Sequence, residues 1–117
     1  MTPGQRLVDY LLDMLEAVRL ARSYVGPMSD TEFFADRRTQ QAVILNFLVI
    51  GEAATQLSTR FPEYPTAHSE VPWQSLRGMR NRMAHGYFSI NLPTVLDTVK
   101  RDLPDLEDKL AALIAKG

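Results

Sequence analysis

The fold is decided by an uninterrupted segment from Thr39 to Arg60, which reads TQQAVILNFLVIGEAATQLSTR. No proline breaks it, and its apolar residues recur at helical spacing over more than half of the circumference. A helix with so wide an apolar face contacts neighbours on two sides or also forms a subunit interface. Gly51, Ala53 and Ala54 would let a neighbouring backbone approach closely. Glycine costs a helix about 1 kcal/mol relative to alanine, so Gly51 requires a packing reason.

Two helical segments are predicted before this one. From Arg6 to Val25, apolar residues recur at spacings of three and four, and charged residues occupy the other side. The pattern stops at Gly26-Pro27, because proline cannot continue a helix. Ser29 and Glu32 have the spacing of a capping box and predict the start of a short second helical segment.

Two further helices are predicted after it. The segment from Phe61 to Pro72 holds three prolines and is predicted to be a loop. A helix then begins at Pro72 and ends at Gly86, which suits the preferences of proline and glycine for these positions. Asn91 is the predicted cap of a last helix that reaches Ile114, with Pro104 kinking or splitting it. Four principal helices with short connections predict an all-α antiparallel four-helix bundle.

Length and composition limit the class of protein. At 117 residues the chain fits one domain, residues 1–117, and it has no cysteine. Charged residues interrupt the first 25 positions, so a secretory signal is not expected. The most apolar run, from Ala42 to Ile50, is shorter than the roughly 20 residues that cross a bilayer. We therefore expect a soluble, cytoplasmic protein without a membrane partner.

A concentrated positive site lies in the Pro72–Gly86 helix. The formal net charge of the chain is −1, yet Arg77, Arg80, Arg82 and His85 occur with no acidic residue from position 71 to 96. Arginine binds phosphate through a planar fork of donors, and histidine transfers protons near neutral pH. These residue types suit cleavage of an RNA phosphodiester with no metal and no cofactor. The alternative is a solvated helix face in which His85 interacts with the helix C-terminus.

Helix geometry restricts how Arg80 and His85 can act together. They are five residues apart in sequence, so they lie roughly 140° apart around an ideal helix. Either His85 lies past the last regular turn and swings back, or two copies of this helix assemble the site across a two-fold axis. We favour a homodimer, because the wide apolar face of the Thr39–Arg60 helix gives an independent reason for one.

Several motifs together resemble the HepT-like family of the HEPN superfamily. They are Ile50-Gly51-Glu52-Ala53-Ala54, Val71-Pro72-Trp73, Gly78-Met79-Arg80-Asn81, His85-Gly86-Tyr87 and Leu103-Pro104-Asp105-Leu106. The resemblance spans nearly the whole chain. It implies an all-α homodimer with arginine and histidine in a cleft between subunits, metal-independent ribonuclease activity, and an MNT nucleotidyltransferase antitoxin as partner.

The resemblance also implies roles for individual residues. Arg80 and His85 match the catalytic pair, and Asn81 matches the residue expected to orient the loop or His85 by hydrogen bonding. Tyr87 matches the tyrosine to which the antitoxin transfers AMP. Glu52 lies in a largely apolar helix, so we expect it to pair with an arginine of the Pro72–Gly86 helix.

The leading hypothesis is a toxin-type endoribonuclease that binds RNA through Arg77, Arg80 and Arg82 and cleaves with Arg80 and His85. The competing class is a non-enzymatic HEPN module that binds nucleotide or RNA, or partners a nucleotidyltransferase. A third class is a purely structural helical dimer. Trp73 is predicted in the core, and His68, with Glu70 nearby, on the surface.

Overall fold

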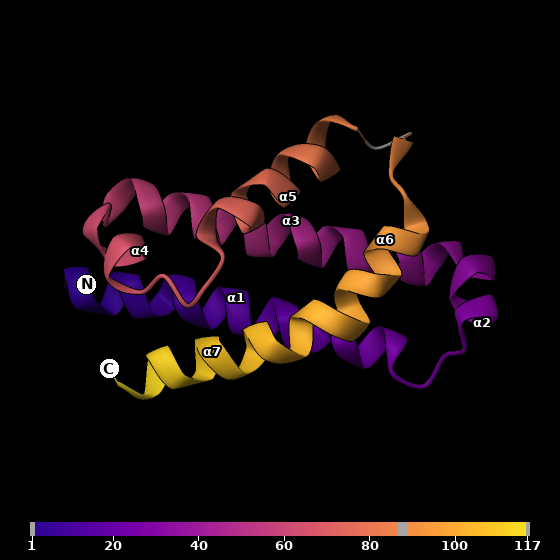
Figure 1. Ribbon diagram of the computed structural model, residues 1–117, viewed down its shortest axis with the longest axis horizontal. Coiled ribbons are helices and arrows are strands. Elements are labelled where there is room, and N and C mark those ends of the chain that lie inside the picture. Colours follow the sequence, from indigo (N-terminus) through magenta and orange to yellow (C-terminus); the bar gives the residue numbers. More distant parts are fainter. Residues whose placement is uncertain (1, 87–88, 117) are drawn as a thin grey trace.

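The computed structural model describes residues 2–86 and 89–116, and no strand occurs among them. Helices follow one another closely along the chain (Figure 1). They are α1 (Pro3–Val25), α2 (Asp30–Ala35), α3 (Arg37–Arg60), α4 (Glu63–Ala67), α5 (Trp73–His85), α6 (Leu92–Asp97), the π-helix η2 (Thr98–Asp102) and α7 (Leu103–Ala115). The predicted all-α class is confirmed, whereas the antiparallel bundle, the single domain and the homodimer stay predictions.

Side-chain caps determine where several helices begin. The predicted capping box of Ser29 and Glu32 is present at the start of α2, and the predicted Asn91 cap accepts from the Thr94 N–H at 3.0 Å. Asp36 caps α3 by accepting from the Thr39 N–H at 3.0 Å, so α3 begins at Arg37, two residues earlier than predicted. Each cap satisfies a backbone donor that has no partner within its helix.

The structure corrects one expectation about the proline-containing segments and specifies another. The predicted loop from Phe61 to Pro72 contains a short helix, α4. Pro65 does not prevent it, because it falls in the first turn, where the backbone N–H that proline lacks would have no partner within the helix. Before Pro104 the last helix widens into η2, and the Leu103 N–H donates to the Thr98 carbonyl five residues earlier. The predicted interruption at Pro104 is therefore a π-helical turn, and the chain is α-helical on both sides of it.

The helix α3 lies at the centre of the packing. One side contacts α1 and another contacts α5, while α7 packs against α1 (Figure 1). The expected two-sided burial of α3 is confirmed by Phe47, Ile50 and Leu57, each at most 1% exposed. Leu45 remains 60% exposed and Val49 39% exposed, so α3 also keeps an uncovered apolar strip.

The length and composition of α3 would also allow it to cross a membrane, which the short run from Ala42 to Ile50 did not suggest. Half of its most apolar window is buried against the other helices. The core helix of a soluble protein has the same property, so this finding is weak evidence for a membrane span. The cytoplasmic location stays a prediction.

Candidate active site

The helices α3 and α5 are in close contact at Gly51. A Cβ atom built on Gly51 would lie 2.2 Å from the Arg80 Cβ and 2.7 Å from the Leu76 carbonyl oxygen, distances that real Cβ atoms do not show. Only glycine therefore allows the two backbones to come this close. The expected packing reason for Gly51 is confirmed, and the residue that it faces on α5 is Arg80.

Arg80 is held on two sides. Its Nε donates to Glu52 Oε2 at 2.9 Å, and its Nη1 donates to Asn81 Oδ1 at 2.9 Å. The predicted pairing of Glu52 with an arginine of α5 is thus confirmed. The Arg80 side chain is 36% exposed, so its remaining N–H groups can reach a ligand in solvent.

Asn81 connects Arg80 to His85. Its side chain accepts from Arg80, and its backbone carbonyl lies 3.1 Å from His85 Nδ1. A carbonyl oxygen can only accept, so this contact places a proton on Nδ1 and leaves Nε2 of a neutral His85 with a free lone pair. This contact is also the one expected of a histidine that interacts with a helix C-terminus.

His85 is the last residue of α5 and belongs to its final turn. His85 is therefore part of the regular helix. The alternative in which it lies past the last regular turn and swings back toward Arg80 does not describe this structure. Arg80 turns toward α3, whereas His85 is exposed. Among the described residues of one copy, Asn81 is the one that contacts both side chains.

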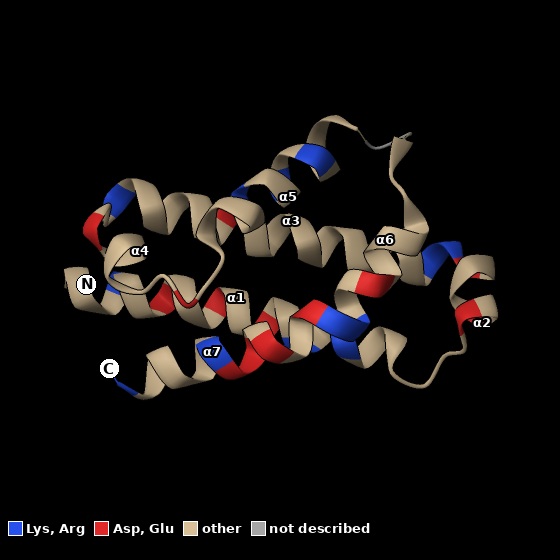
Figure 2. Cartoon of the chain, in the orientation of Figure 1, with Lys and Arg blue, Asp and Glu red and all other residues tan. Residues whose placement is uncertain are grey.

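The other two arginines separate around α5. Arg77 is three residues before Arg80 and four before Asn81, spacings that place the three on one face of the helix. Arg82 is two residues after Arg80, about 200° further around, and it lines a cavity on the other side of α5. Both Arg77 and Arg82 are exposed, and α5 carries blue segments and no red ones in Figure 2.

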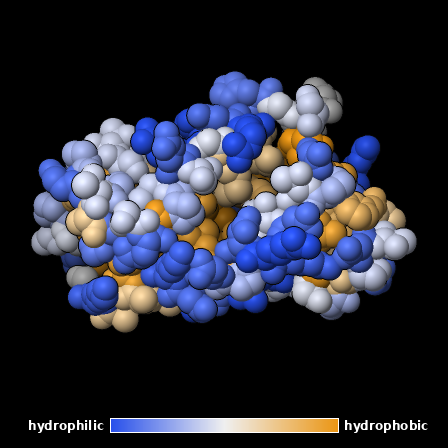
Figure 3. Space-filling view, in the orientation of Figure 1, coloured by the Kyte–Doolittle hydropathy of each residue, from blue (hydrophilic) through white to orange (hydrophobic). Residues whose placement is uncertain are grey.

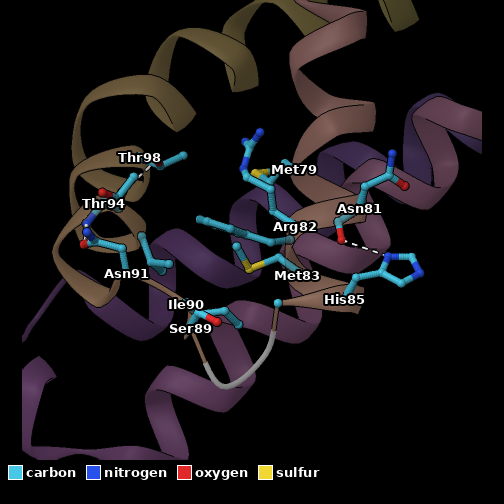
Figure 4. Close-up of a pocket in the computed structure, with 13 residues that line it drawn as sticks. Met79, Asn81, Arg82, Met83, His85, Ser89, Ile90, Asn91, Thr94 and Thr98 are labelled. Carbon is cyan, nitrogen blue, oxygen red and sulfur yellow. Dashed lines mark hydrogen bonds between the residues drawn. The ribbon is translucent and has the colours of Figure 1, made fainter.

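That cavity was not predicted from the sequence. It occupies about 600 Å³ between α5 and α6, and we call it the α5–α6 cavity. Figure 4 shows Met79, Arg82 and Met83 pointing from α5 toward α6, while Asn81 and His85 extend to the other side of α5. Its residues are Phe47, Met79, Asn81, Arg82, Met83, His85, Gly86, Ser89, Ile90, Asn91, Thr94, Val95 and Thr98.

A second hollow continues from the cavity along α5. It lies between α5 and α7 and shares Met79, Arg82 and Thr98 with the α5–α6 cavity. Apolar residues are visible at the bottom of the hollow between these helices (Figure 3). The sequence contained one signal for the polar wall of the cavity, because Asn91, Thr94 and Thr98 recur at the spacing of one helix face.

Two predicted residues lie at the start of α5 and shortly before it. Trp73 is 7% exposed, and its indole N–H donates to the His68 carbonyl at 2.8 Å, which confirms its place in the core. His68 was expected on the surface, but it is half-buried because its ring stacks on Tyr64 with centroids 4.3 Å apart. Its Nδ1 lies 3.8 Å from Glu70 Oε2. This cluster fixes the α4–α5 connection.

Tyr87, the predicted modification site, lies outside the described residues. Within residues 2–86 and 89–116, no three histidine or acidic side chains are grouped as metal ligands would be. Metal independence itself stays a prediction.

Comparison with known families gives a match along most of the chain. The family model described as "Ribonuclease HepT-like" matches residues 14–113. No solved structure matches the chain significantly.

Curated relatives agree with this match. A protein of Thermococcus cleftensis named "Probable ribonuclease HepT" is 34% identical over 105 residues, which cover 90% of this chain and 93% of that protein. A protein of Caldanaerobacter subterraneus subsp. tengcongensis is 30% identical over 92% of this chain and 93% of its own length. One of Methanocaldococcus jannaschii is 35% identical over 88% of this chain and 83% of its own length. Both of these carry the name "Putative RNase".

Proposed function

The chain belongs to the ribonuclease HepT-like family, and from this premise we propose that it cleaves RNA without a metal ion at a site centred on Arg80 and His85. One observation carries the proposal for the site: the Asn81 side chain accepts from Arg80, and its carbonyl lies 3.1 Å from His85 Nδ1, which leaves Nε2 free when Nδ1 is the donor. The free Nε2 is then available as a base, beside a guanidinium that can bind phosphate.

The proposed reaction is transesterification. His85 Nε2 takes the proton of a ribose 2′-hydroxyl, the 2′-oxygen forms a bond to phosphorus, and the bond from phosphorus to the 5′-oxygen breaks. A protonated group donates a proton to the leaving 5′-oxygen. Arg80 stabilises the charge that builds up on the equatorial phosphate oxygens. The products are a 2′,3′-cyclic phosphate and a 5′-hydroxyl, so no water and no metal enter the chemical step.

The proton donor points to a second copy of the chain. One copy exposes a single histidine at this face, and a two-fold axis beside α5 would bring a second His85 to serve as the acid. Support comes from α3, where the exposed Leu45 and Val49 share a face with Glu52 at spacings of four and seven residues. An interface on that face would bury the apolar strip and enclose Arg80.

The homodimer is tested by sedimentation of the wild type and of Leu45→Glu. We expect a dimer that dissociates in the variant, with loss of cleavage. A wild-type monomer at micromolar concentration that still cleaves RNA would contradict the shared site. Leu12→Glu is the control, because Leu12 is also an exposed leucine, 44%, but lies on α1.

The activity is tested by incubating RNA with the purified protein in excess chelator. We expect cleavage by the wild type, none by Arg80→Ala or His85→Ala, and unchanged cleavage by Arg60→Ala, which removes an exposed arginine at the far end of α3. RNA binding with no cleavage by the wild type would instead identify a non-catalytic binding module. If the wild type neither binds nor cleaves RNA, the remaining class is a purely structural dimer.

We further propose that the ribonuclease is the toxin of a pair whose antitoxin is an MNT-type nucleotidyltransferase acting in the cytoplasm. Tyr87 follows His85 by two residues, so an AMP group on its hydroxyl would place a bulky anion beside the site and repel RNA phosphate. Mass spectrometry of the protein co-expressed with such an enzyme tests this. An unmodified Tyr87 in an inactive complex would contradict it.

A further inference from the structure

We propose that the α5–α6 cavity binds a nucleobase of the RNA, from a nucleotide that flanks the scissile phosphate. This inference rests on the proposed function and extends it. The residues Arg80 and His85 could act on any phosphodiester, whereas a base-binding cavity would decide which phosphodiester of the RNA is cleaved. A base turned into a pocket is read by contact with its faces and by hydrogen bonds to its edge.

The cavity has the size and walls that such a ligand requires. Its volume of about 600 Å³ lies within the range of small-molecule sites and exceeds that of a single base. Met79 and Met83 of α5 and Phe47 of α3 are buried apolar residues, and they form its inner wall. Thioethers are polarizable and adapt to flat rings, so this wall suits a base face. A purine would cover more of it than a pyrimidine.

Hydrogen-bonding groups face that wall from α6 and the residues before it. The Asn91 Oδ1 is occupied by the Thr94 N–H, and no other bond of the Asn91 side chain is found in the described part of the chain. The Ser89 and Thr94 hydroxyls likewise have no bond to a described residue. Donors and acceptors are therefore available at one edge of the cavity, where the polar edge of a base would lie.

The charges around the cavity favour an anionic ligand. Of the described residues that line it, Arg82 and His85 are basic and none is a carboxylate. The neighbouring hollow between α5 and α7 differs, because three carboxylates, of Glu70, Asp102 and Asp105, line it together with three basic residues, Arg82, Arg101 and Lys109. An apolar segment of a protein would gain nothing from the basic residues of the cavity. RNA, which carries one phosphate per nucleotide, would be attracted to the cavity more strongly than to the hollow beside α7, where acidic and basic residues balance.

The cavity also continues into the candidate active site. Asn81 and His85 belong to both, since they border the cavity while their side chains extend to the other side of α5 (Figure 4). A strand that passes the C-terminal end of α5 would place one phosphate near His85 and the next nucleotide beside Arg82. The Arg82 guanidinium is exposed and can bind the phosphate between them.

The test uses DNA oligonucleotides that carry a single ribonucleotide, so that only one phosphodiester can be cleaved through a 2′-hydroxyl. The base is removed from the nucleotide on either side of that phosphate. For the wild type, we expect kcat/KM to fall about tenfold or more for an abasic site on one side. Equal cleavage of the intact and both abasic substrates would overturn the inference while leaving the proposed ribonuclease activity in place.

A variant tests whether the cavity is where the base binds. Thr94→Phe fills the cavity from an exposed position of α6, so we expect it to cleave the intact substrate no faster than the abasic one. Thr66→Phe is the matched control, because Thr66 is an exposed residue of α4 at the other end of the molecule, and it should behave as the wild type (Figure 1). A Thr94→Phe protein that still distinguishes the two substrates would contradict the assignment.

Binding is measured separately from cleavage with a 2′-O-methyl RNA, which cannot be cleaved. Affinity that falls about tenfold for the abasic analogue supports the base site even if the wild type proves inactive, in which case only the proposed catalysis fails. Binding of free AMP to the wild type is measured as the last comparison. Binding of AMP in the cavity together with no abasic effect on RNA would identify a free-nucleotide site and overturn the assignment to RNA.

Discussion

The two sides of α5 are built in opposite ways. Toward α3 the helix is in direct backbone contact at Gly51, and Arg80 is fixed there by Glu52 and Asn81. Toward α6 the same helix faces a cavity of about 600 Å³, and Arg82 extends along it. We call these the closed side and the open side of α5.

This difference indicates a division of labour. A group that stabilises a transition state must be held before the substrate arrives, and the closed side provides that for Arg80. A group that selects a substrate needs space, which only the open side provides. Changes on the closed side should therefore lower kcat, and changes on the open side should mainly raise KM.

The largest effect is expected when the two arginines are each replaced by lysine. Lysine has no planar fork, so Arg80→Lys cannot contact Glu52, Asn81 and a phosphate together, and kcat should fall about 100-fold or more. Arg82→Lys keeps a positive charge at the open side and should change KM only a few-fold. Steady-state kinetics on one RNA substrate measure both, and equal losses in kcat would contradict the division.

The glycines of the two sides give the next largest effect. Gly51→Ala would force α5 away from α3, so we expect a loss of about 1–3 kcal/mol in the free energy of unfolding and about a tenfold fall in kcat. At Gly78 a Cβ would meet only the end of the Arg82 side chain, at 3.3 Å. Gly78→Ala should therefore stabilise the protein by up to about 1 kcal/mol. Urea unfolding of both variants decides this, and a tolerated Gly51→Ala would refute the close contact.

A smaller effect is expected for Glu52. The pair with Arg80 is partly exposed, with side chains 47% and 36% accessible, so Glu52→Gln should change the free energy of unfolding by less than about 1 kcal/mol. The kcat should nevertheless fall several-fold, because the orientation of Arg80 loosens. Both quantities are measured for Glu52→Gln at several temperatures. If the kcat falls only in proportion to the fraction of the variant that is unfolded, Glu52 stabilises the fold and does not position Arg80.

The smallest effect is expected away from both sides, between α1 and α7. Hydrogen bonds and charge from Arg22, then Arg19, lower the pKa of Glu107. A lowered pKa in the folded state adds stability above the ordinary carboxyl pKa of 4.5, and this contribution is lost as the pH falls through the lowered value. Glu107→Gln should therefore lower stability at neutral pH by less than about 1 kcal/mol and reduce its loss in acid. The kcat should not change.

The closed side was predictable and the open side was not, for a physical reason. Gly51 in the middle of an apolar helix indicates a close contact, and the acidic Glu52 beside it requires a partner, so local rules led to a pair with an arginine of the next long helix. The structure identifies that arginine as Arg80. The α5–α6 cavity depends on how far α6 stands from α5, which no local pattern contains. The same holds for α4, since three prolines in a short segment indicate a loop unless packing selects a helical turn.

The arrangement of the charged residues shows the same limit. Helix periodicity places Arg77 with Arg80 and directs Arg82 elsewhere, although the three arginines formed one group in the sequence. Their separation to two sides follows from which face of α5 packs on α3. The hydrogen bond from His85 to Asn81 could be expected only as one of several possible contacts at a helix end.

The central claim is that Arg80 and His85 of α5 perform transesterification without a metal ion. It is tested most directly by mass spectrometry of the RNA ends produced by the wild-type protein in excess chelator. We predict 2′,3′-cyclic phosphate and 5′-hydroxyl ends, formed at the same rate with and without the chelator. Ends with a 3′-hydroxyl and a 5′-phosphate, or cleavage that stops when metal is removed, would contradict it.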